Sequence, residues 1–230
     1  MGKSITYRAL ARVLGVALLV LGIGCLIGGN FANGFISSQL SKQEIDIPTD
    51  KSLDNQIAKT GLNADVADGL RKWAGQTMSN GDQTHPYAEY IGEHMRLAAS
   101  TAGYPEVNFK KLAGMISDQK AALTKKVTAD NPTMSDEQVA KQVAAESINP
   151  LSKYDEALAI QTLTDLRSNT FFMGSMLQGT LLNVWGWSLI GKIATIAGWI
   201  LVVGGVLLGG AGFWPAKKAT PATSTNPQES

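Results

Sequence analysis

The stretch Val13-Leu-Gly-Val-Ala-Leu-Leu-Val-Leu-Gly-Ile-Gly-Cys-Leu-Ile-Gly-Gly29 decides the fold class of this 230-residue chain. It holds no charged residue, and it is long enough for a helix that crosses the hydrocarbon core of a bilayer, which takes about 17–25 apolar residues. Residues 30–35 extend it with two phenylalanines that suit the membrane interface. We therefore predict a first transmembrane helix over residues 13–35.

A second uncharged run lies near the other end of the chain. Residues 193–213 carry no charge, and Lys192 is close enough to their start to extend its ammonium group toward the interface. Trp185 and Trp187 fit an outer aromatic belt, and Trp214 fits an inner one. A helix between Trp187 and Trp214 would rise about 40 Å, close to the full thickness of a bilayer with its headgroups. Residues 187–214 are thus predicted to form the second transmembrane helix.

Basic residues set the orientation of the two helices. Loops rich in Lys and Arg beside a span stay in the cytoplasm. Such residues flank both spans on their terminal sides: Lys3, Arg8, Arg12, Lys217 and Lys218. The prediction is a two-pass protein of the cell membrane with both termini in the cytoplasm. Residues 1–12 form a basic N-terminus, residues 36–186 an extracytoplasmic domain, and residues 215–230 a disordered tail rich in Ser, Thr and Pro.

The first span has two other interpretations. A basic start followed by an apolar run is also typical of a cleaved signal peptide, but this run is long and no clear Ala-x-Ala site follows it. Cys25 could instead be the attachment site of a lipoprotein, but Gly22 stands where such sites usually have leucine. An uncleaved anchor fits the sequence best.

The middle of the chain has the pattern of a helical domain. Residues 37–190 contain 14 Lys and Arg against 18 Asp and Glu, and the alternation typical of strands is absent. Helices are predicted over residues 63–77, from His85-Pro86 with proline in the first turn, from the N-cap Asn108, from the capping box at Ser135, and from the N-cap Ser152 through Leu166. The predicted fold class is all-α, with two transmembrane helices flanking an extracytoplasmic helical domain.

Composition and motifs exclude several classes of function. A net charge of +1 without a basic stripe argues against binding of nucleic acid, and a single cysteine excludes a disulfide scaffold. No phosphate loop, dinucleotide fingerprint or nucleophile elbow occurs in the sequence. His85 and His94 are nine residues apart and fall on opposite faces of one helix, so they cannot bind the same metal ion. We therefore expect no enzyme activity, no metal and no cofactor.

One helical face of the middle domain could line a ligand cavity. His94 falls on the apolar face of its helix and is expected to be a packed histidine whose polar atoms are satisfied; a ligand-binding or proton-linked role is the alternative. Glu93 falls on the opposite, solvated face. The candidate cavity residues share this aromatic stretch: Tyr87, Tyr90, His94 and Met95.

Small residues at a spacing of four predict close packing of the spans. Gly24-x-x-x-Gly28 lies at the depth of Ala194-x-x-x-Gly198, and Gly205-x-x-x-Gly209 at the depth of Ala11-x-x-x-Gly15. Such pairs allow helix backbones to approach closely within one chain or against a partner, although glycine is also common in spans without any packing role.

A further apolar cluster precedes the second span. It exceeds what a helix needs for its own core, and we predict that it forms a collar at the outer surface that is partly buried against a partner or in the interface: Phe171, Phe172, Met173, Met176 and Leu177.

Two segments carry a resemblance to known proteins. Pro86-Tyr-Ala-Glu-Tyr-Ile-Gly-Glu-His-Met95 and Thr170-Phe-Phe-Met-Gly-Ser-Met-Leu-Gln-Gly-Thr-Leu-Leu-Asn-Val-Trp-Gly-Trp187 are similar to segments of uncharacterised actinobacterial membrane proteins with two spans and an external helical domain. Some of those proteins carry a ring-opening dioxygenase label, but the two histidines and carboxylate that such an iron site needs do not converge here. The layout resembles accessory subunits of large membrane complexes and implies an actinobacterial respiratory supercomplex as the candidate host.

These observations lead to one expected function and one alternative. The first is a non-catalytic accessory or scaffold subunit of a bacterial membrane complex that docks through its external helical domain. The alternative is an extracytoplasmic ligand-binding or sensing module anchored in the membrane, and a hydrolase or cell-envelope enzyme ranks third. The expected partners are membrane lipid and subunits of a membrane-protein complex, with a homo-oligomer as a further option and no nucleic acid.

Overall fold

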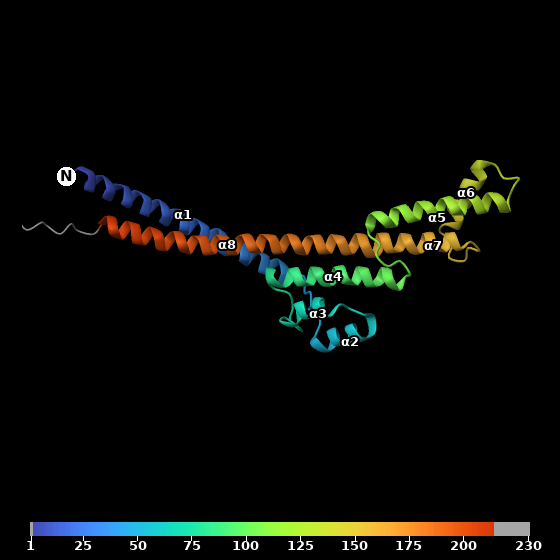
Figure 1. Cartoon of the computed structure of the whole chain (residues 1–230), viewed down its shortest axis with the longest axis horizontal. Coiled ribbons are helices and arrows are strands. Elements are labelled where there is room, and N and C mark those ends of the chain that lie inside the picture. Colours follow the sequence, from blue (N-terminus) through green and yellow to red (C-terminus); the bar gives the residue numbers. More distant parts are fainter. Residues whose placement is uncertain (1, 214–230) are drawn as a thin grey trace, which may run out of the picture. The chain divides into compact units, whose positions relative to one another are not determined.

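The computed structural model describes residues 2–213, with side chains from residue 6 onward, and this part of the chain is helical (Figure 1). The prediction of an all-α fold is confirmed, because these residues form no strand and only one isolated antiparallel bridge, between Asp46 and Thr77. The elements are α1 (Gly2–Ser41), α2 (Asp50–Thr60), α3 (Ala64–Arg71), α4 (Gly81–Thr101), α5 (Phe109–Asp130), α6 (Asp136–Glu146), α7 (Asp155–Asp165), the π-helix η1 (Leu166–Phe172) and α8 (Met173–Phe213).

The chain divides into two compact units, which we call the hairpin and the helical domain. The hairpin contains the residues up to Ala32 and those from Ile190 onward, and the helical domain contains Asn33–Leu189. The divisions fall close to the predicted ends of the two spans. Trp214, Lys217, Lys218 and the tail predicted over residues 215–230 lie outside the described residues.

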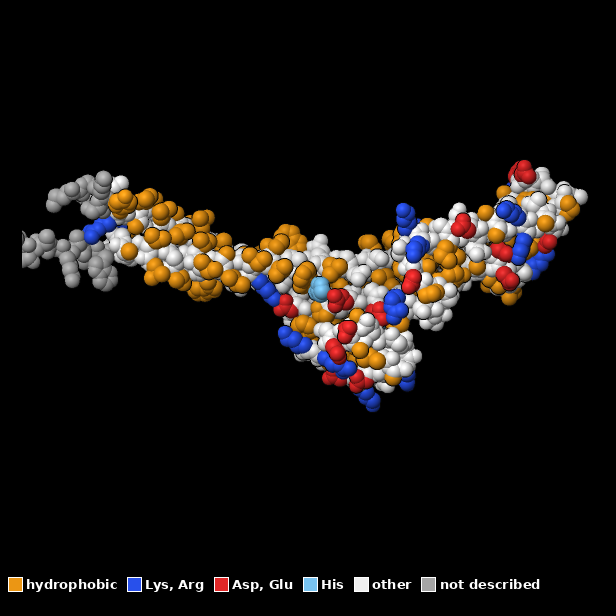
Figure 2. Space-filling model, viewed as in Figure 1, with side chains coloured by type: hydrophobic (Ala, Val, Ile, Leu, Met, Phe, Trp, Pro, Cys, Tyr) orange, Lys and Arg blue, Asp and Glu red, His pale blue; other side chains and the backbone are white. Residues whose placement is uncertain are grey.

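In the hairpin, α1 and the C-terminal half of α8 run side by side in opposite directions (Figure 1). The helical segments Thr6–Ser41 and Asp155–Phe213 are each long and apolar enough to cross a membrane. Large apolar side chains are exposed over both helices, for example Val20 and Leu207, and Figure 2 shows the orange surface that they form. At one end, the Arg12 guanidinium donates a 2.9 Å hydrogen bond to the Gly212 carbonyl and stacks on the Phe213 ring.

The helical domain has several small cores in place of one large core. Leu53 and Leu70 join α2 to α3 and to Tyr90 of α4. Arg71 forms ion pairs with three aspartates of α2 and α3, with Asp54 and Asp68 both at 2.7 Å. Further along the domain, separate clusters join α4, α5 and η1, and then α5, α6 and α7. Charged side chains of both signs are scattered over the surface of this unit (Figure 2).

Helix α4 packs antiparallel on the N-terminal half of α8 along a seam with alternating steps of four and three residues. The α4 residues on this seam are Gly81, His85, Ala88, Gly92 and Met95. Opposite them lie Ser188, Trp185, Leu181, Gln178 and Gly174. The Gln178 amide donates a 3.1 Å hydrogen bond to the Ala88 carbonyl, which fixes the register at the middle of the seam. The steps of four and three match the knob positions of a coiled coil.

Two predicted helix starts are confirmed and two are wrong. Asn108 caps α5, and Ser135 forms the capping box of α6 with Gln138. Helix α4 begins four residues before His85, because Asn80 and Gln83 form a capping box there, so Pro86 lies inside the helix and not in its first turn. Tyr154, and not Ser152, is the N-cap of α7; the Ser152 hydroxyl accepts a 3.2 Å hydrogen bond from the Tyr154 N–H.

The segment before α4 holds more helix than predicted. A helix is predicted over residues 63–77; helix α3 begins after its N-cap Asn63 and already ends at Arg71. The additional helix α2 begins after its N-cap Thr49 and ends at Gly61, whose positive φ of 73° terminates it in the left-handed conformation.

Candidate functional site

The seam of the hairpin is built on glycines at a spacing of seven residues. On α1 these are Gly15, Gly22 and Gly29, and a Cβ atom at Gly22 would lie 2.8 Å from the Val202 nitrogen and 2.9 Å from the Gly198 oxygen. At Gly15, a Cβ atom would lie 2.6 Å from the Gly209 nitrogen. Real Cβ atoms do not approach backbone this closely, so only glycine fits at these positions.

The opposite helix repeats the arrangement. Gly198 and Gly205 of α8 receive the side chains of Leu26 and Leu19, and a Cβ atom at Gly205 would lie 2.8 Å from the Gly15 oxygen. On each helix, glycines therefore pack against larger side chains of the other helix. A strict seven-residue period keeps such a seam in register over several turns.

The structure corrects half of the predicted glycine motif. Around a Cβ atom at Gly24 or Gly28 there is nothing within 4 Å, so this pair lies off the seam, and its predicted contact with Ala194 and Gly198 is wrong. Of the second predicted pairing, the contact at Gly15 is confirmed, because Gly205 and the backbone of Gly209 lie against it, although a Cβ atom at Gly209 would meet nothing within 4 Å. Ala194 is half-buried.

The predicted collar loses one member. Phe171 is buried, 8% exposed, in the cluster that joins α4, α5 and η1, and so does not face outward. The other four residues are exposed: Phe172 at 49%, Met173 at 61%, Met176 at 60% and Leu177 at 38%. From here on, the collar means these four residues.

The π-helix η1 explains this change. Leu163 and Leu166 are buried at an α-helical step of three, but the next buried residue is Phe171, five positions on. A π-helix places residues i and i+5 in line, so the buried face moves by one position. Beyond the π-helix, Gly174 contacts Met95 and the α-helical pattern resumes. Phe172, the residue after Phe171, lies on the outer face. Its ring centroid is 6.4 Å from that of Phe109.

A hollow adjoins the collar on the same helix. It has a volume of about 360 Å³ and is lined by Ser175, Met176, Gly179, Thr180, Asn183 and Val184. No residue from 168 to 191 is charged. An apolar knob beside an uncharged hollow is a surface suited to contact with another protein.

Three of the four residues of the predicted ligand cavity are divided between separate clusters, and the fourth, His94, is exposed. Tyr87 and Tyr90 pack with the α2–α3 core, and their ring centroids are 5.6 Å apart. Met95 packs in the next cluster, against Gly174. Burial raises the pKa of both tyrosine hydroxyls, and Tyr90 donates a 2.8 Å hydrogen bond to Gln56. These side chains therefore contribute mainly to packing.

The prediction that His94 is packed and Glu93 is solvated is wrong, because the structure shows the reverse. The His94 side chain is exposed, although its Nδ1 lies 3.0 Å from the Tyr90 carbonyl and its ring contacts the Tyr90 ring. Glu93 is buried at 9% exposure, where it accepts hydrogen bonds from Arg96 and from the Asn63 N–H. Glu93 thus connects α4 to the N-cap of α3, a role that the helical wheel does not predict.

Glu93 makes the stability of the helical domain sensitive to acid. The ion pair with Arg96 lowers the pKa of Glu93 below its ordinary value, which means that the folded state favours the carboxylate. Its contribution is complete above the unfolded pKa of about 4.3 and is lost as the pH falls through the lowered folded pKa.

We therefore expect Glu93→Gln to destabilise the domain by about 1 kcal/mol at pH 7 and to reduce its loss of stability below pH 4.5. Melting temperatures measured between pH 7 and 3 test this. Glu137→Gln is the matched control, because Glu137 and its partner Lys141 are 79% and 75% exposed. Equal pH profiles for wild type and Glu93→Gln would contradict this role.

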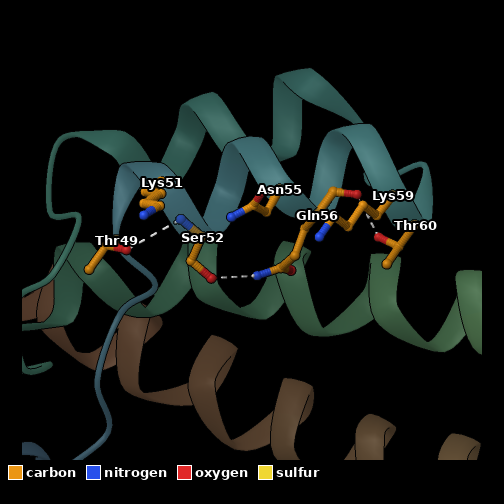
Figure 3. Close-up of a pocket in the computed structure, with 7 residues that line it drawn as sticks. All are labelled: Thr49, Lys51, Ser52, Asn55, Gln56, Lys59 and Thr60. Carbon is orange, nitrogen blue, oxygen red and sulfur yellow. Dashed lines mark hydrogen bonds between the residues drawn. The ribbon is translucent and has the colours of Figure 1, made fainter.

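A shallow hollow lies on the surface of α2. Its lining residues come from α2 and its N-cap (Figure 3): Thr49, Lys51, Ser52, Asn55, Gln56, Lys59 and Thr60. Several of them bond to one another, as where Gln56 donates a 3.1 Å hydrogen bond to Ser52. Between residues 2 and 213, no group of three or more His, Cys, Asp or Glu could hold a metal ion.

No family model, curated protein or solved structure matches this chain.

Proposed function

We propose that the protein is a non-catalytic subunit of a larger membrane assembly, anchored by the α1/α8 hairpin and docked through the helical domain. The observation that carries the proposal is the exposed collar on an uncharged stretch that runs from η1 into α8. Three of its residues, Phe172, Met173 and Met176, are each about half exposed or more.

The place of the collar in the helical domain, and not in the hairpin, favours protein over lipid as its cover. Arg12, bound to Gly212, and Lys192 are the charged residues that bracket the apolar part of the hairpin. The helix between Lys192 and Gly212 rises about 30 Å, which matches the hydrocarbon core. Met176 precedes Lys192 by sixteen residues and belongs to the helical domain, not to the apolar part of the hairpin.

The proposed orientation has both termini in the cytoplasm and the helical domain outside. We expect Lys125→Cys, made with Cys25→Ala, to react with a membrane-impermeant maleimide in intact cells, because Lys125 is exposed on α5. A label that appears only after lysis would contradict this orientation.

The sensing module is the weaker of the two proposals. Three of its four candidate residues are packed in separate clusters and His94 is exposed, whereas the collar side chains project from their helix. The size of the wild-type protein in mild detergent tests the subunit role, since we expect a particle that contains further protein chains.

A further inference from the structure

We propose that the protein which covers the collar presents a carboxylate side chain to Arg167, an inference that rests on the proposed subunit role. Arg167 lies in η1, and a π-helix places residues i and i+5 in line, so Arg167 and Phe172 share one side of this helix. Both contact the Phe109 ring of α5. The Arg167 Cζ atom lies 4.1 Å from its centroid, and the Phe172 ring centroid lies 6.4 Å from it. Arg167 is therefore at the edge of the collar.

The Arg167 guanidinium has no anionic partner within the described part of the chain. Its Nε atom is buried and forms no hydrogen bond there. The Nη groups form no hydrogen bond or ion pair with the described residues either, but unlike Nε they are open to solvent. The other two arginines of the helical domain differ in this respect, because Arg71 pairs with Asp54 and Arg96 pairs with Glu93.

The surface around the collar is basic although the domain that carries it is acidic. Residues 107–117, at the start of α5, contain Lys110 and Lys111 and no acidic residue, and residues 166–191 contain one arginine as their only charge. Residues 37–190 as a whole carry 14 Lys and Arg against 18 Asp and Glu. An apolar centre edged by positive charges is complementary to a partner surface whose apolar centre is edged by acidic residues.

Loss of water on binding selects the group that meets Arg167. A partner that covers the collar would remove water from the Nη groups, and a guanidinium that loses water without gaining an acceptor opposes binding. A carboxylate supplies the opposite charge, and its two oxygens match the planar fork of the guanidinium. Arginine and aromatic side chains are also enriched among the residues that dominate protein interfaces.

The same charges argue against a second copy of this chain as the partner. A two-fold contact through the collar would bring the basic surface of one copy against the same surface of the other. Like charges placed opposite each other in an interface oppose association. The partner is therefore a different protein chain.

Zero-length carbodiimide coupling in gently solubilised membranes tests the proposal. This reagent joins a lysine amine to a carboxylate with loss of water and does not couple arginine, so Arg167→Lys places a reactive amine at the edge of the collar and keeps the charge. We expect mass spectrometry to find position 167 of this variant linked to an aspartate or glutamate of another protein, and wild type to lack that link. The ion pair of Lys153 with Asp130, at 3.2 Å, is the internal control for the coupling.

The affinity for the partner provides a second measurement. Arg167→Gln should weaken binding by about tenfold or more, and Arg167→Lys by less, because lysine keeps the charge and loses the planar fork. The fraction of partner that stays bound on dilution of the purified complex gives the affinity. Lys125→Gln is the matched control, because it removes the same charge from an exposed position on α5, fifteen residues beyond Lys110.

Three results would overturn the proposal. The first is coupling of Lys153 to Asp130 without any link from position 167, and the second is equal affinity of wild type and Arg167→Gln. The third is a link from position 167 to a second copy of the chain, which would assign the collar to a homo-oligomer. The first two leave the subunit role intact if wild type purifies with further chains, whereas a lone wild-type monomer would contradict the subunit role itself.

Discussion

Alanine at Gly22 is expected to destabilise the α1/α8 hairpin by about 1–3 kcal/mol, whereas alanine at Gly24 is expected to change its stability by less than about 1 kcal/mol. The two glycines lie two residues apart on one helix. A Cβ atom at Gly22 would clash with backbone atoms of Gly198 and Val202, which cannot move without separating the helices. At Gly24 the same atom meets nothing within 4 Å.

A second pair repeats the comparison on α8. Gly205→Ala should destabilise the hairpin, because its Cβ atom would lie 2.8 Å from the Gly15 oxygen, and Gly204→Ala should not. The measurement is an SDS titration followed by energy transfer between dyes on cysteines at Val13 and Leu207, both well exposed, in a Cys25→Ala background. Equal midpoints for the Gly22 and Gly24 variants would contradict the seam.

The sequence contains the signal for this seam, although the spacing of four obscures it. Gly24-x-x-x-Gly28 and Gly205-x-x-x-Gly209 both fit the familiar motif for close packing. The period that operates in the structure is seven, through Gly15, Gly22 and Gly29. The glycine-rich segment of α1 contains both the spacing of four and the spacing of seven. Only the contacts with α8 show which of the two spacings faces the other helix.

The collar was predictable except for its register. The excess of apolar residues before the second span correctly indicated an exposed surface at Phe172 and Met176. The burial of Phe171 depends on the π-helix η1, which adds a residue to one turn. A pattern computed at a constant 100° per residue cannot represent that turn.

Local signals and tertiary packing differ in how far the sequence reveals them. Asn108 and Ser135 cap helices through bonds to residues three positions on, so their roles are visible in the sequence. Glu93 is buried because Asn63, thirty residues away, donates a hydrogen bond to it. A helical wheel considers one helix alone, so it places Glu93 in solvent and cannot include the hydrogen bond from Asn63.

Replacing Phe172 and Met176 together by glutamate is expected to abolish association with the partner. Both side chains are exposed, so the change should leave the folded chain intact while placing two charges in an apolar interface. Large apolar anchors at the centre of an interface each contribute about 2 kcal/mol or more, so the combined loss should exceed a factor of 100 in affinity.

Two controls separate loss of contact from loss of fold. Phe172→Leu with Met176→Leu keeps the surface apolar and should retain the partner with a modest loss of affinity. The melting temperature of the glutamate variant should match that of wild type, because neither side chain belongs to a buried cluster. A lower melting temperature in the glutamate variant would assign these residues to the core of the chain itself.

Co-purification from gently solubilised membranes tests the central claim most directly. The measurement compares the proteins that elute with tagged wild type, with the double leucine variant and with the double glutamate variant. Light scattering gives the molar mass of each eluted particle. We predict the same additional chains with wild type and the leucine variant, and none with the glutamate variant. Wild type that elutes as a lone monomer would contradict the proposal that the protein is a subunit of a larger assembly.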